Sequence, residues 1–319
     1  MPGPSQAQTI RIVVPATTAN LGAGFDALAL ALEMANVVDI ELVIGRPGWV
    51  DLNVEGEGAG RLRVGRGNRF IGGLRAGLEA AGADFRQWSY RITMRNEIPL
   101  SRGLGSSAAA AVGGLVAARE LAGTAGAAAL PDARILELAA TAEGHPDNAA
   151  AAVYGGFVVV AAVDGVPRAV RFDPPAALTC ALFIPERPLS TAAMRAALPE
   201  FVPLGDAVHN VGAAALCVAA FATGDLDLLR AATEDRLHEP YRAAAVYPEL
   251  PKLVAAARDA GALGACLSGA GSTVIAFADS PGRAESAGRA MAAAAAAAGM
   301  AGTARVIRPR SDGATAAHL

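Results

Sequence analysis

A glycine-rich loop that leads into an alanine-rich run is the feature that most limits how this chain can fold. The segment consists of Pro99, Leu100, Ser101, Arg102, Gly103, Leu104, Gly105, Ser106, Ser107, Ala108 and Ala109. Such a loop leaves backbone N–H groups free, and the helix predicted after it adds its own unpaired N–H groups and the positive end of its dipole. Together these groups form a site for an anion, and a polyphosphate is the most obvious one.

Three interpretations of this loop are open: a nucleotide phosphate loop, a Rossmann turn, and a structural turn before a helix. Gly103 to Ala108 formally fits G-x-G-x-x-A, but a Rossmann turn follows its strand directly, whereas residues 96–102 intervene here. No lysine stands where a Walker A loop has one. The sequence therefore favours a phosphate loop of another kind, in which a side chain at Gly105 is expected to block the phosphates.

The composition indicates a globular protein. The 319 residues suggest two domains or one large one, and the net charge of −3 argues against nucleic-acid binding. The cysteines Cys180, Cys217 and Cys266 are far apart and odd in number, which predicts buried thiols in a reducing cytoplasm. The start, MPGPSQAQTI, shows no signal peptide, and the apolar stretches are broken by Gly, Pro or charge, so no membrane span is expected.

Strand and helix patterns are mixed without regular alternation, which favours an α+β fold over a doubly wound sheet. Predicted strands cover residues 9–15, 36–44, 89–95, 155–163, 178–184 and 273–277. Predicted helices cover residues 68–81, 106–121, 131–143, 191–198, 206–222, 225–236, 249–261 and 291–298. The stretch 166–175, rich in Pro and charge, is the predicted boundary between domains 1–165 and 166–319, and the chain is expected to fray from about residue 308.

Two further segments carry candidate site residues. Glu143 is a plausible Mg²⁺ ligand, because this cation prefers carboxylate and phosphate oxygens. His145 has no partner at zinc spacing, which favours a hydrogen-bonding role. In the N-terminal loop 15–26, Asn20 can donate and accept hydrogen bonds, and Asp26 can bind an ammonium or a hydroxyl. A second glycine turn follows at 268–272.

These segments, in this order, resemble the superfamily named for galactokinase, homoserine kinase, mevalonate kinase and phosphomevalonate kinase (GHMP kinases), and within it the homoserine kinases. PLSRGLGSSAAA is similar to the superfamily phosphate loop, and VPATTANLGAGFDALALAL and EGHPDNAAAAVYGGF resemble the homoserine kinase versions. LSGAGST resembles the C-terminal glycine motif, with Ser272 where proline is common. The resemblance implies a two-domain GHMP kinase fold, with an ATP-binding, ribosomal protein S5 domain 2-like N-terminal domain and a ferredoxin-like C-terminal domain.

The resemblance also implies an activity: phosphorylation of L-homoserine by ATP with Mg²⁺, giving O-phospho-L-homoserine on the path to threonine. Arg195 stands in STAAMR and Arg242 in EPYR, stretches whose arginines hold the amino-acid carboxylate in the family. A guanidinium suits this role because its planar donors match a carboxylate. By the same likeness, Asp26 faces the α-ammonium, and Asn20 and His145 contact the substrate.

For the metal, the resemblance implies Glu143 together with Ser106, with Glu137 as the alternative carboxylate. Asn148 stands where other superfamily members have an aspartate base, and an amide cannot take a proton in that role. We therefore expect Asn148 to orient the substrate hydroxyl, while positioning and charge neutralisation carry the reaction.

Two other functions stay open from the sequence: a GHMP kinase with another acceptor, such as mevalonate or a sugar, and a nucleotide-binding regulatory protein without turnover. The paired arginines and Asn148 weigh against the former, and intact Glu143 and Ser106 weigh against the latter. The resemblance further implies a homodimer, although no exposed apolar stripe is recognisable in the sequence.

Overall fold

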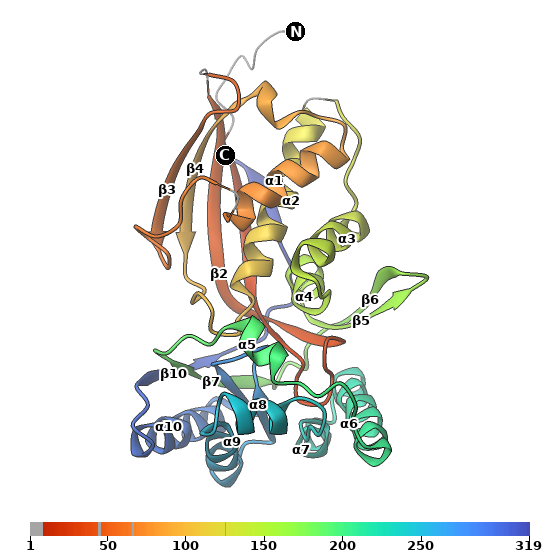
Figure 1. The fold of residues 1–319 in the computed structure, drawn as a ribbon, viewed down its shortest axis with the longest axis vertical. Coiled ribbons are helices and arrows are strands. Elements are labelled where there is room, and N and C mark those ends of the chain that lie inside the picture. Colours follow the sequence, from red (N-terminus) through yellow and green to blue (C-terminus); the bar gives the residue numbers. More distant parts are fainter. Residues whose placement is uncertain (1–8, 44–45, 66, 125) are drawn as a thin grey trace.

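The computed structural model describes residues 9–43, 46–65, 67–124 and 126–319. The prediction about a signal peptide concerns mainly residues 1–8, which lie outside this description, as does residue 44 of the strand predicted over 36–44. The described chain forms an N-terminal part and a C-terminal part, which stand one above the other in Figure 1.

The N-terminal part is built on a seven-stranded sheet with the order β11-β1-β2-β4-β3, in which β5 pairs with both β2 and β6. Its strands are β1 (Thr9–Ala19), β2 (Leu28–Val43), β3 (Val50–Gly56), β4 (Ser89–Asn96), β5 (Phe157–Val163), β6 (Val166–Phe172) and β11 (Thr315–His318). The β3–β4 pair is parallel and the other pairs are antiparallel. A register shift between Pro15 and Ala16 lets β1 continue to Ala19, so the loop expected from residue 16 begins later.

Four helices lie against this sheet (Figure 1): α1 (Arg69–Ala80), α2 (Ser106–Thr124), α3 (Asp132–Glu143) and α4 (Asp147–Tyr154), with a short 3₁₀ turn η1 (Phe85–Gln87). Asn68 caps α1 as predicted, since its Oδ1 accepts from the backbone N–H of Ile71 at 3.2 Å. Glycines let α1 and α2 approach closely: a Cβ at Gly73 would lie 2.2 Å from the carbonyl oxygen of Ala111. The alanine-rich composition of α2 therefore serves tight packing between α1 and the sheet.

The C-terminal part contains an antiparallel sheet with the order β10-β7-β9-β8. Its strands are β7 (Thr179–Pro185), β8 (Gly264–Leu267), β9 (Val274–Ala278) and β10 (Gly302–Ile307). The helical elements are α5 (Thr191–Ala196), α6 (Leu204–Thr223), η2 (Leu226–Leu228), α7 (Leu229–Ala232), α8 (Glu239–Ala245), α9 (Leu250–Asp259) and α10 (Pro281–Ala297). This strand order is that of a ferredoxin-like sheet, and the predicted α+β two-domain fold is confirmed.

The end of the chain does not fray, and that prediction is wrong. Residues after β10 return to the N-terminal part, where β11 pairs with β1. The backbone N–H of Arg310 donates to Ala31, and that of Ala314 donates to Ala152. Short polar or alanine-rich strands such as TAAH carry little β signal, and only the exposed edge of β1 creates the pairing.

Several other elements differ from the sequence prediction: β2 begins eight residues earlier than the predicted strand, and β3, α4, β8 and β10 were not predicted. The stretch 166–175, predicted as the domain boundary, contains β6, which forms a hairpin with β5. The boundary at 165/166 thus falls inside one hairpin, and it stays a prediction. The helix expected over 225–236 stops at Ala232, and the separate helix α8 follows. The run 291–298 is the end of the longer helix α10.

Helix α6 is long and apolar enough, by length and composition, to cross a membrane, and among the described residues one helix meets that test. In this structure it lies on the surface of the C-terminal part, with 28% of its most apolar window buried. A single helix of this kind is weak evidence for a span. The prediction of no membrane span stays a prediction.

Candidate active site

A cavity of about 250 Å³ opens between the two parts at the start of α2. Most residues singled out in the sequence line it: Asn20, Asp26, Ser101, Arg102, Gly103, Gly105, Ser106, Ser107, Ala108, Glu143, His145, Asn148, Arg195 and Arg242. The remaining loop residues Pro99, Leu100, Leu104 and Ala109 are not part of this lining, and Leu104 and Ala109 are buried in the core. Segments far apart in the sequence thus meet at the positive end of α2.

Hydrogen bonds tie the glycine-rich loop to the loops on both sides of the cavity. The backbone N–H of Thr17 donates to the carbonyl of Leu104 at 3.2 Å, and the Ser268 hydroxyl donates to the carbonyl of Gly103 at 2.7 Å. Gly103 and Gly105 adopt positive φ angles of 77° and 69°. A Cβ at Gly103 would lie 2.1 Å from the carbonyl oxygen of Ser268, so only glycine allows this close approach.

Arg102 holds the loop against the C-terminal sheet. Its guanidinium donates to the carbonyl oxygens of Pro185 (2.7 Å), Leu100 (2.9 Å) and Glu186. These contacts give Arg102 a structural role between the two parts of the protein.

Glu143, at the end of α3, faces the start of α2. The Ser107 hydroxyl donates to its carboxylate at 2.8 Å, and the guanidinium of Arg69 lies 3.7 Å away. The sequence favoured Ser106 as the partner of Glu143; the structure joins Glu143 to Ser107, while Ser106 lines the same cavity. Hydroxyl and carboxylate oxygens in this arrangement suit Mg²⁺, which prefers oxygen ligands.

The alternative carboxylate, Glu137, lies outside this cavity. It forms an ion pair with Arg134 at 2.6 Å, one turn earlier on α3, and 38% of its side chain is exposed. The geometry therefore favours Glu143 over Glu137 as a candidate metal ligand.

Asp26 and Arg195 face each other across the cavity in a two-point ion pair. The two nitrogens of Arg195 donate to the carboxylate oxygens at 2.7 and 3.1 Å. Asn20 supports this arrangement, since its Oδ1 accepts from the backbone N–H of Asp26 and its Nδ2 donates to the carbonyl of Gly269. The amide of Asn20 thus joins the N-terminal loop to the C-terminal glycine turn.

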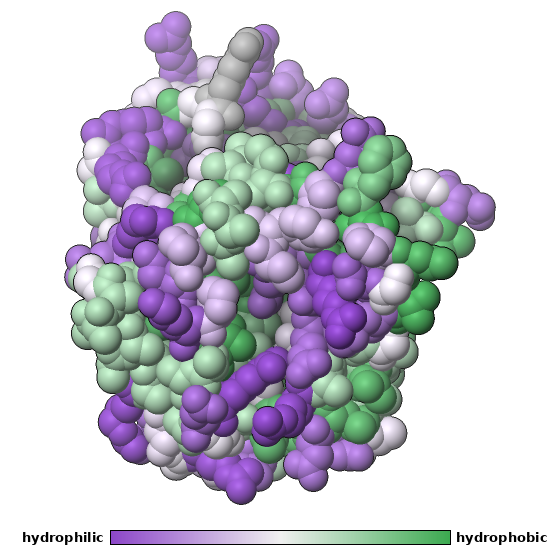
Figure 2. Space-filling model, turned by 60° about the horizontal axis from the view of Figure 1, so that its bottom comes forward, coloured by the Kyte–Doolittle hydropathy of each residue, from purple (hydrophilic) through white to green (hydrophobic). Residues whose placement is uncertain are grey.

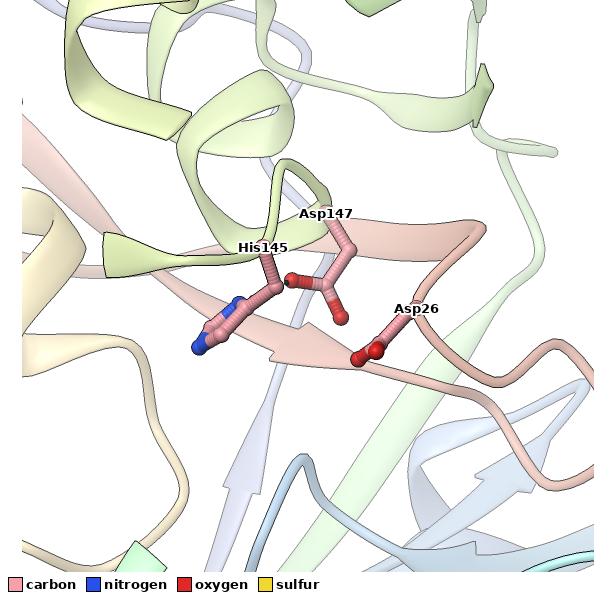
Figure 3. Close-up of side chains that lie close together, drawn as sticks. All are labelled: Asp26, His145 and Asp147. Atoms are coloured by element: carbon pink, nitrogen blue, oxygen red, sulfur yellow. Dashed lines mark hydrogen bonds and ion pairs between the residues drawn. The ribbon is translucent and has the colours of Figure 1, made fainter. Parts of the chain in front are cut away.

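His145 and Asp147 form a second pair beside Asp26 (Figure 3). The Nδ1 of His145 donates to Asp147 at 2.8 Å, because a carboxylate oxygen only accepts. This hydrogen bond, opposed by burial, raises the pKa of His145. The ligand atoms of Asp26, His145 and Asp147 lie within 4.8 Å of one another, and Arg195 already neutralises Asp26.

Asn148 follows Asp147 at the start of α4 and is held from two sides. The Thr17 hydroxyl donates to its Oδ1 at 2.7 Å, and its backbone N–H donates to Asp147 at 2.7 Å. Sequence reasoning singled out Asn148 but missed Thr17 and Asp147. Asp147 lies inside the EGHPDN motif and was detectable there, whereas nothing in the sequence relates Thr17 to Asn148.

Arg242 is a buried cation, 1% exposed, whose guanidinium reaches the cavity from α8. Its Nη1 donates to the carbonyl of Gly269 at 3.1 Å, and its Nε donates to the carbonyl of Met194 at 3.3 Å. The ring of Phe25 lies 5.4 Å from the guanidinium carbon of Arg242 and 5.6 Å from that of Arg195. Two cations therefore flank one aromatic ring at the same end of the cavity.

Family models match two parts of this chain: the GHMP kinases N terminal domain over residues 68–156, and the GHMP kinases C terminal model over residues 217–297. A homoserine kinase of Moorella thermoacetica is 42% identical over 301 residues, which cover 94% of this chain and 97% of the relative. A homoserine kinase of Streptomyces coelicolor is 43% identical over 281 residues, 88% of each chain.

Solved structures with the same fold include homoserine kinase from Cytophaga hutchinsonii, with a TM-score of 0.86 and 29% identity over 99% of this chain and 100% of that one. Mevalonate kinase of L. major in complex with R-mevalonate has a TM-score of 0.73 at 18% identity, over 97% of this chain and 99% of that one, which extends the likeness of fold alone.

Proposed function

The chain belongs to the homoserine kinase family of the GHMP kinases, and we propose on this basis that it transfers the γ-phosphoryl group of ATP to the hydroxyl oxygen of L-homoserine. The product is O-phospho-L-homoserine, on the path to threonine. One observation carries the proposal: a single cavity joins an anion-binding loop to the Asp26–Arg195 ion pair and Arg242. The first feature suits a phosphoryl donor, and the second suits an amino acid.

The donor side consists of the loop from Gly103 to Ser107 and the first turn of α2. Its backbone N–H groups and the helix dipole attract the β- and γ-phosphates of ATP. Glu143 with Ser106 or Ser107 would hold Mg²⁺, which would neutralise charge on the phosphates.

The acceptor side matches a zwitterion. The α-carboxylate of homoserine pairs with Arg195 and Arg242, and its α-ammonium pairs with Asp26. His145 and Asn20 complete the surroundings of the substrate. Asn148, fixed by Thr17, orients the hydroxyl toward the phosphate loop. The hydroxyl proton passes to phosphate or solvent, because an amide cannot accept it.

Release of ADP in the presence of Mg-ATP tests this function. L-homoserine, mevalonate, galactose and no acceptor are compared at equal concentrations. We expect turnover with L-homoserine and a product that is O-phosphorylated. Turnover with mevalonate or galactose instead would assign another acceptor, and ATP binding without any turnover would assign a regulatory protein.

We propose in addition that the protein is a homodimer formed through α6. Four exposed apolar side chains lie on α6 at Leu204, Val208, Val211 and Leu216, and Leu204 and Val211 are 81% and 72% exposed. Figure 2 shows hydrophobic side chains along the right-hand edge of the molecule, the side on which Figure 1 places both α6 and the β5–β6 hairpin. Positions 204, 208, 211 and 215 follow the spacing of a helix–helix seam; residue 215 is Ala, and Leu216 lies one position beside this row.

This seam fits a second copy of α6 better than it fits a charged surface of another protein. The exposed residues 205, 212 and 215 are Gly, Gly and Ala, which let a partner helix approach closely, and the seam carries no charged side chain along 204, 208, 211 and 215. An apolar face left in water on both copies is removed from solvent when they pair.

Sedimentation velocity tests the dimer with Val208→Asp/Val211→Asp, and Val170→Asp in the β5–β6 hairpin serves as the control, because Val170 is also exposed. We expect a dimer for the wild type and the control and a monomer for the α6 variant. A monomeric wild type, or an α6 variant that stays dimeric, contradicts the assignment.

A cytoplasmic location is part of the same proposal. Cys180, Cys217 and Cys266 are free and buried, and burial raises the pKa of the Cys217 thiol to about 12. Buried thiols of this kind are typical of proteins that fold in a reducing compartment.

A further inference from the structure

A buried hydrogen-bonded chain lies behind the substrate side of the cavity, at the start of α8. His238 precedes this helix and is fully buried, and Arg242 stands one turn later. His238 is not part of the cavity lining, and it contacts the substrate side through Arg242, the carbonyl of Gly22 and the ring of Phe25, whose centroid lies 5.1 Å from that of His238. His238 stands just before the family motif EPYR, which therefore assigns it no role.

The partners of His238 fix its tautomer. Its Nε2 lies 2.8 Å from the carbonyl oxygen of Gly22, and a carbonyl only accepts, so Nε2 carries the proton. Its Nδ1 lies 3.1 Å from Nη1 of Arg242, and a guanidinium only donates, so Nδ1 offers a lone pair. A neutral imidazole satisfies both partners at once, whereas an imidazolium would set an N–H against the guanidinium.

The surroundings keep this ring neutral. Burial lowers the pKa of His238 to about 4, although the nearby Asp235 carboxylate opposes that shift. Asp235 is occupied elsewhere, since it accepts from the backbone N–H groups of Leu237, His238 and Glu239 and from Nδ2 of Asn210. These bonds hold the turn before α8 and with it the main chain of His238.

The buried guanidinium of Arg242 is held by three hydrogen bonds and lies beside the ring of Phe25. Among the described residues, its hydrogen bonds use Nη1, toward His238 and Gly269, and Nε, toward Met194. Nη2 of Arg242 takes part in none of these hydrogen bonds. His238 Nδ1 is the one side-chain acceptor among these three, beside the backbone carbonyls of Met194 and Gly269, and it helps to fix the orientation of the guanidinium.

We propose that His238 is a positioning residue: as the neutral Nε2–H tautomer, it orients Arg242 for the carboxylate of the amino-acid substrate. This inference rests on the proposed function, because it assigns Arg242 to that carboxylate. His238 bridges two segments that form the substrate side, since it joins Gly22 of the N-terminal loop to Arg242 of α8. Displacement of the His238 ring would reorient the guanidinium of Arg242 and leave the phosphate loop unchanged.

Two amide variants separate the two hydrogen bonds of the ring. In His238→Asn, Oδ1 takes the position of Nδ1, which keeps an acceptor for Arg242 and gives up the bond to Gly22. In His238→Gln, Nε2 takes the position of the imidazole Nε2, which keeps the bond to Gly22 and gives up the acceptor. Both variants carry the same functional group, so their general effects on the buried site are matched.

Steady-state kinetics with L-homoserine and ATP provides the measurement. We expect His238→Gln to raise KM for L-homoserine roughly tenfold or more relative to His238→Asn, the effect of losing one hydrogen bond to a charged group. KM for ATP is expected to stay the same in both. In the Arg242→Ala background, the difference between the two amides is expected to vanish. Equal homoserine KM values for the two amides, or a parallel change in KM for ATP, would overturn the proposal.

Absence of homoserine-dependent turnover in the wild-type protein would instead refute the proposed function, so the two failures are distinguishable. If either amide variant does not fold, ¹⁵N-histidine NMR of the wild-type protein gives a second test. At neutral pH, a buried histidine in the neutral Nε2–H form, whose Nδ1 resonance shifts in the spectrum of Arg242→Ala, supports the assignment. A cation or an Nδ1–H tautomer at His238 contradicts it.

Discussion

Gly105 offers the sharpest test of how the phosphate loop is built, because its missing side chain makes room for Thr17. A Cβ at Gly105 would lie 1.9 Å from Oγ1 of Thr17 and 3.1 Å from Oδ1 of Asn148. The sequence suggested that a side chain here would meet phosphate. In the structure, the first obstacle is instead the hydrogen bond that fixes Asn148.

The magnitude follows from two terms. Gly105 has a φ of 69°, and this left-handed conformation costs an ordinary residue about 1–2 kcal/mol. Displacing the Thr17 hydroxyl adds the loss of a buried hydrogen bond, so Gly105→Ala is expected to lower the free energy of unfolding by about 2–3 kcal/mol in total. In a Thr17→Ala background the nearest atom of residue 17 is Cβ, at 3.2 Å, and the backbone term of about 1–2 kcal/mol is what remains.

A double-mutant cycle with Thr17→Ala, Gly105→Ala and the double variant, measured by urea unfolding, therefore has an expected coupling of about 1 kcal/mol. Gly103→Ala is the matched control, since its Cβ would meet the backbone carbonyl of Ser268 at 2.1 Å, which Thr17→Ala leaves in place. We expect additivity for Gly103→Ala within about 0.5 kcal/mol. Additivity at Gly105, or equal coupling at Gly103, would refute the contact between Gly105 and Thr17 as the source of the effect.

Three further outcomes are expected. Arg195→Ala and Arg242→Ala are each expected to weaken L-homoserine binding by about 1.5–3 kcal/mol, which raises KM for L-homoserine and leaves KM for ATP unchanged. An unchanged homoserine KM in both variants would contradict the carboxylate assignment. Glu143→Gln raises the Mg²⁺ concentration needed for half-maximal rate, whereas Glu137→Gln, on the exposed side of α3, does not; equal shifts in both contradict the choice of Glu143. The folded-state pKa of His238 is lowered from 6.5 to about 4, so the unfolded chain binds the extra proton between these values and stability falls as pH decreases from 6.5 to 4. Urea unfolding should show a smaller loss over this window for His238→Asn, by up to about 1.4 kcal/mol per pH unit, and identical slopes would contradict a buried neutral imidazole.

Local signals in the sequence were sufficient wherever one element contains its own determinants. Asn68 caps α1 through a bond three residues away, and α3 spans the predicted run, ending at Gly144 in the left-handed conformation. The glycine-rich loop was likewise recognisable, because glycines at fixed spacing and a following helix are local properties.

Long-range partners explain what the sequence did not reveal. β11 exists because β1 offers an open edge roughly 300 residues earlier in the chain, a distance no local pattern encodes. Thr17 touches Asn148 across 131 positions, and Arg102 finds its carbonyl partners at the end of β7. The exposed seam on α6 was hidden for the same reason: its apolar residues look like core residues until the packing shows which face stays in water.

The ion pair between Asp26 and Arg195 links the fold to the choice of substrate. Its side chains are 31% and 37% exposed, and a pair at that level of solvation contributes about 0–1 kcal/mol, so opening it costs little. An amino acid carries both charges at one carbon and can replace each partner with its own opposite charge. A neutral sugar offers no charge to either residue, and mevalonate carries a carboxylate but no ammonium, which would leave Asp26 without a cation. The pair therefore favours a zwitterion over the other acceptors of the superfamily, because those acceptors would leave a charged side chain of the pair without a partner.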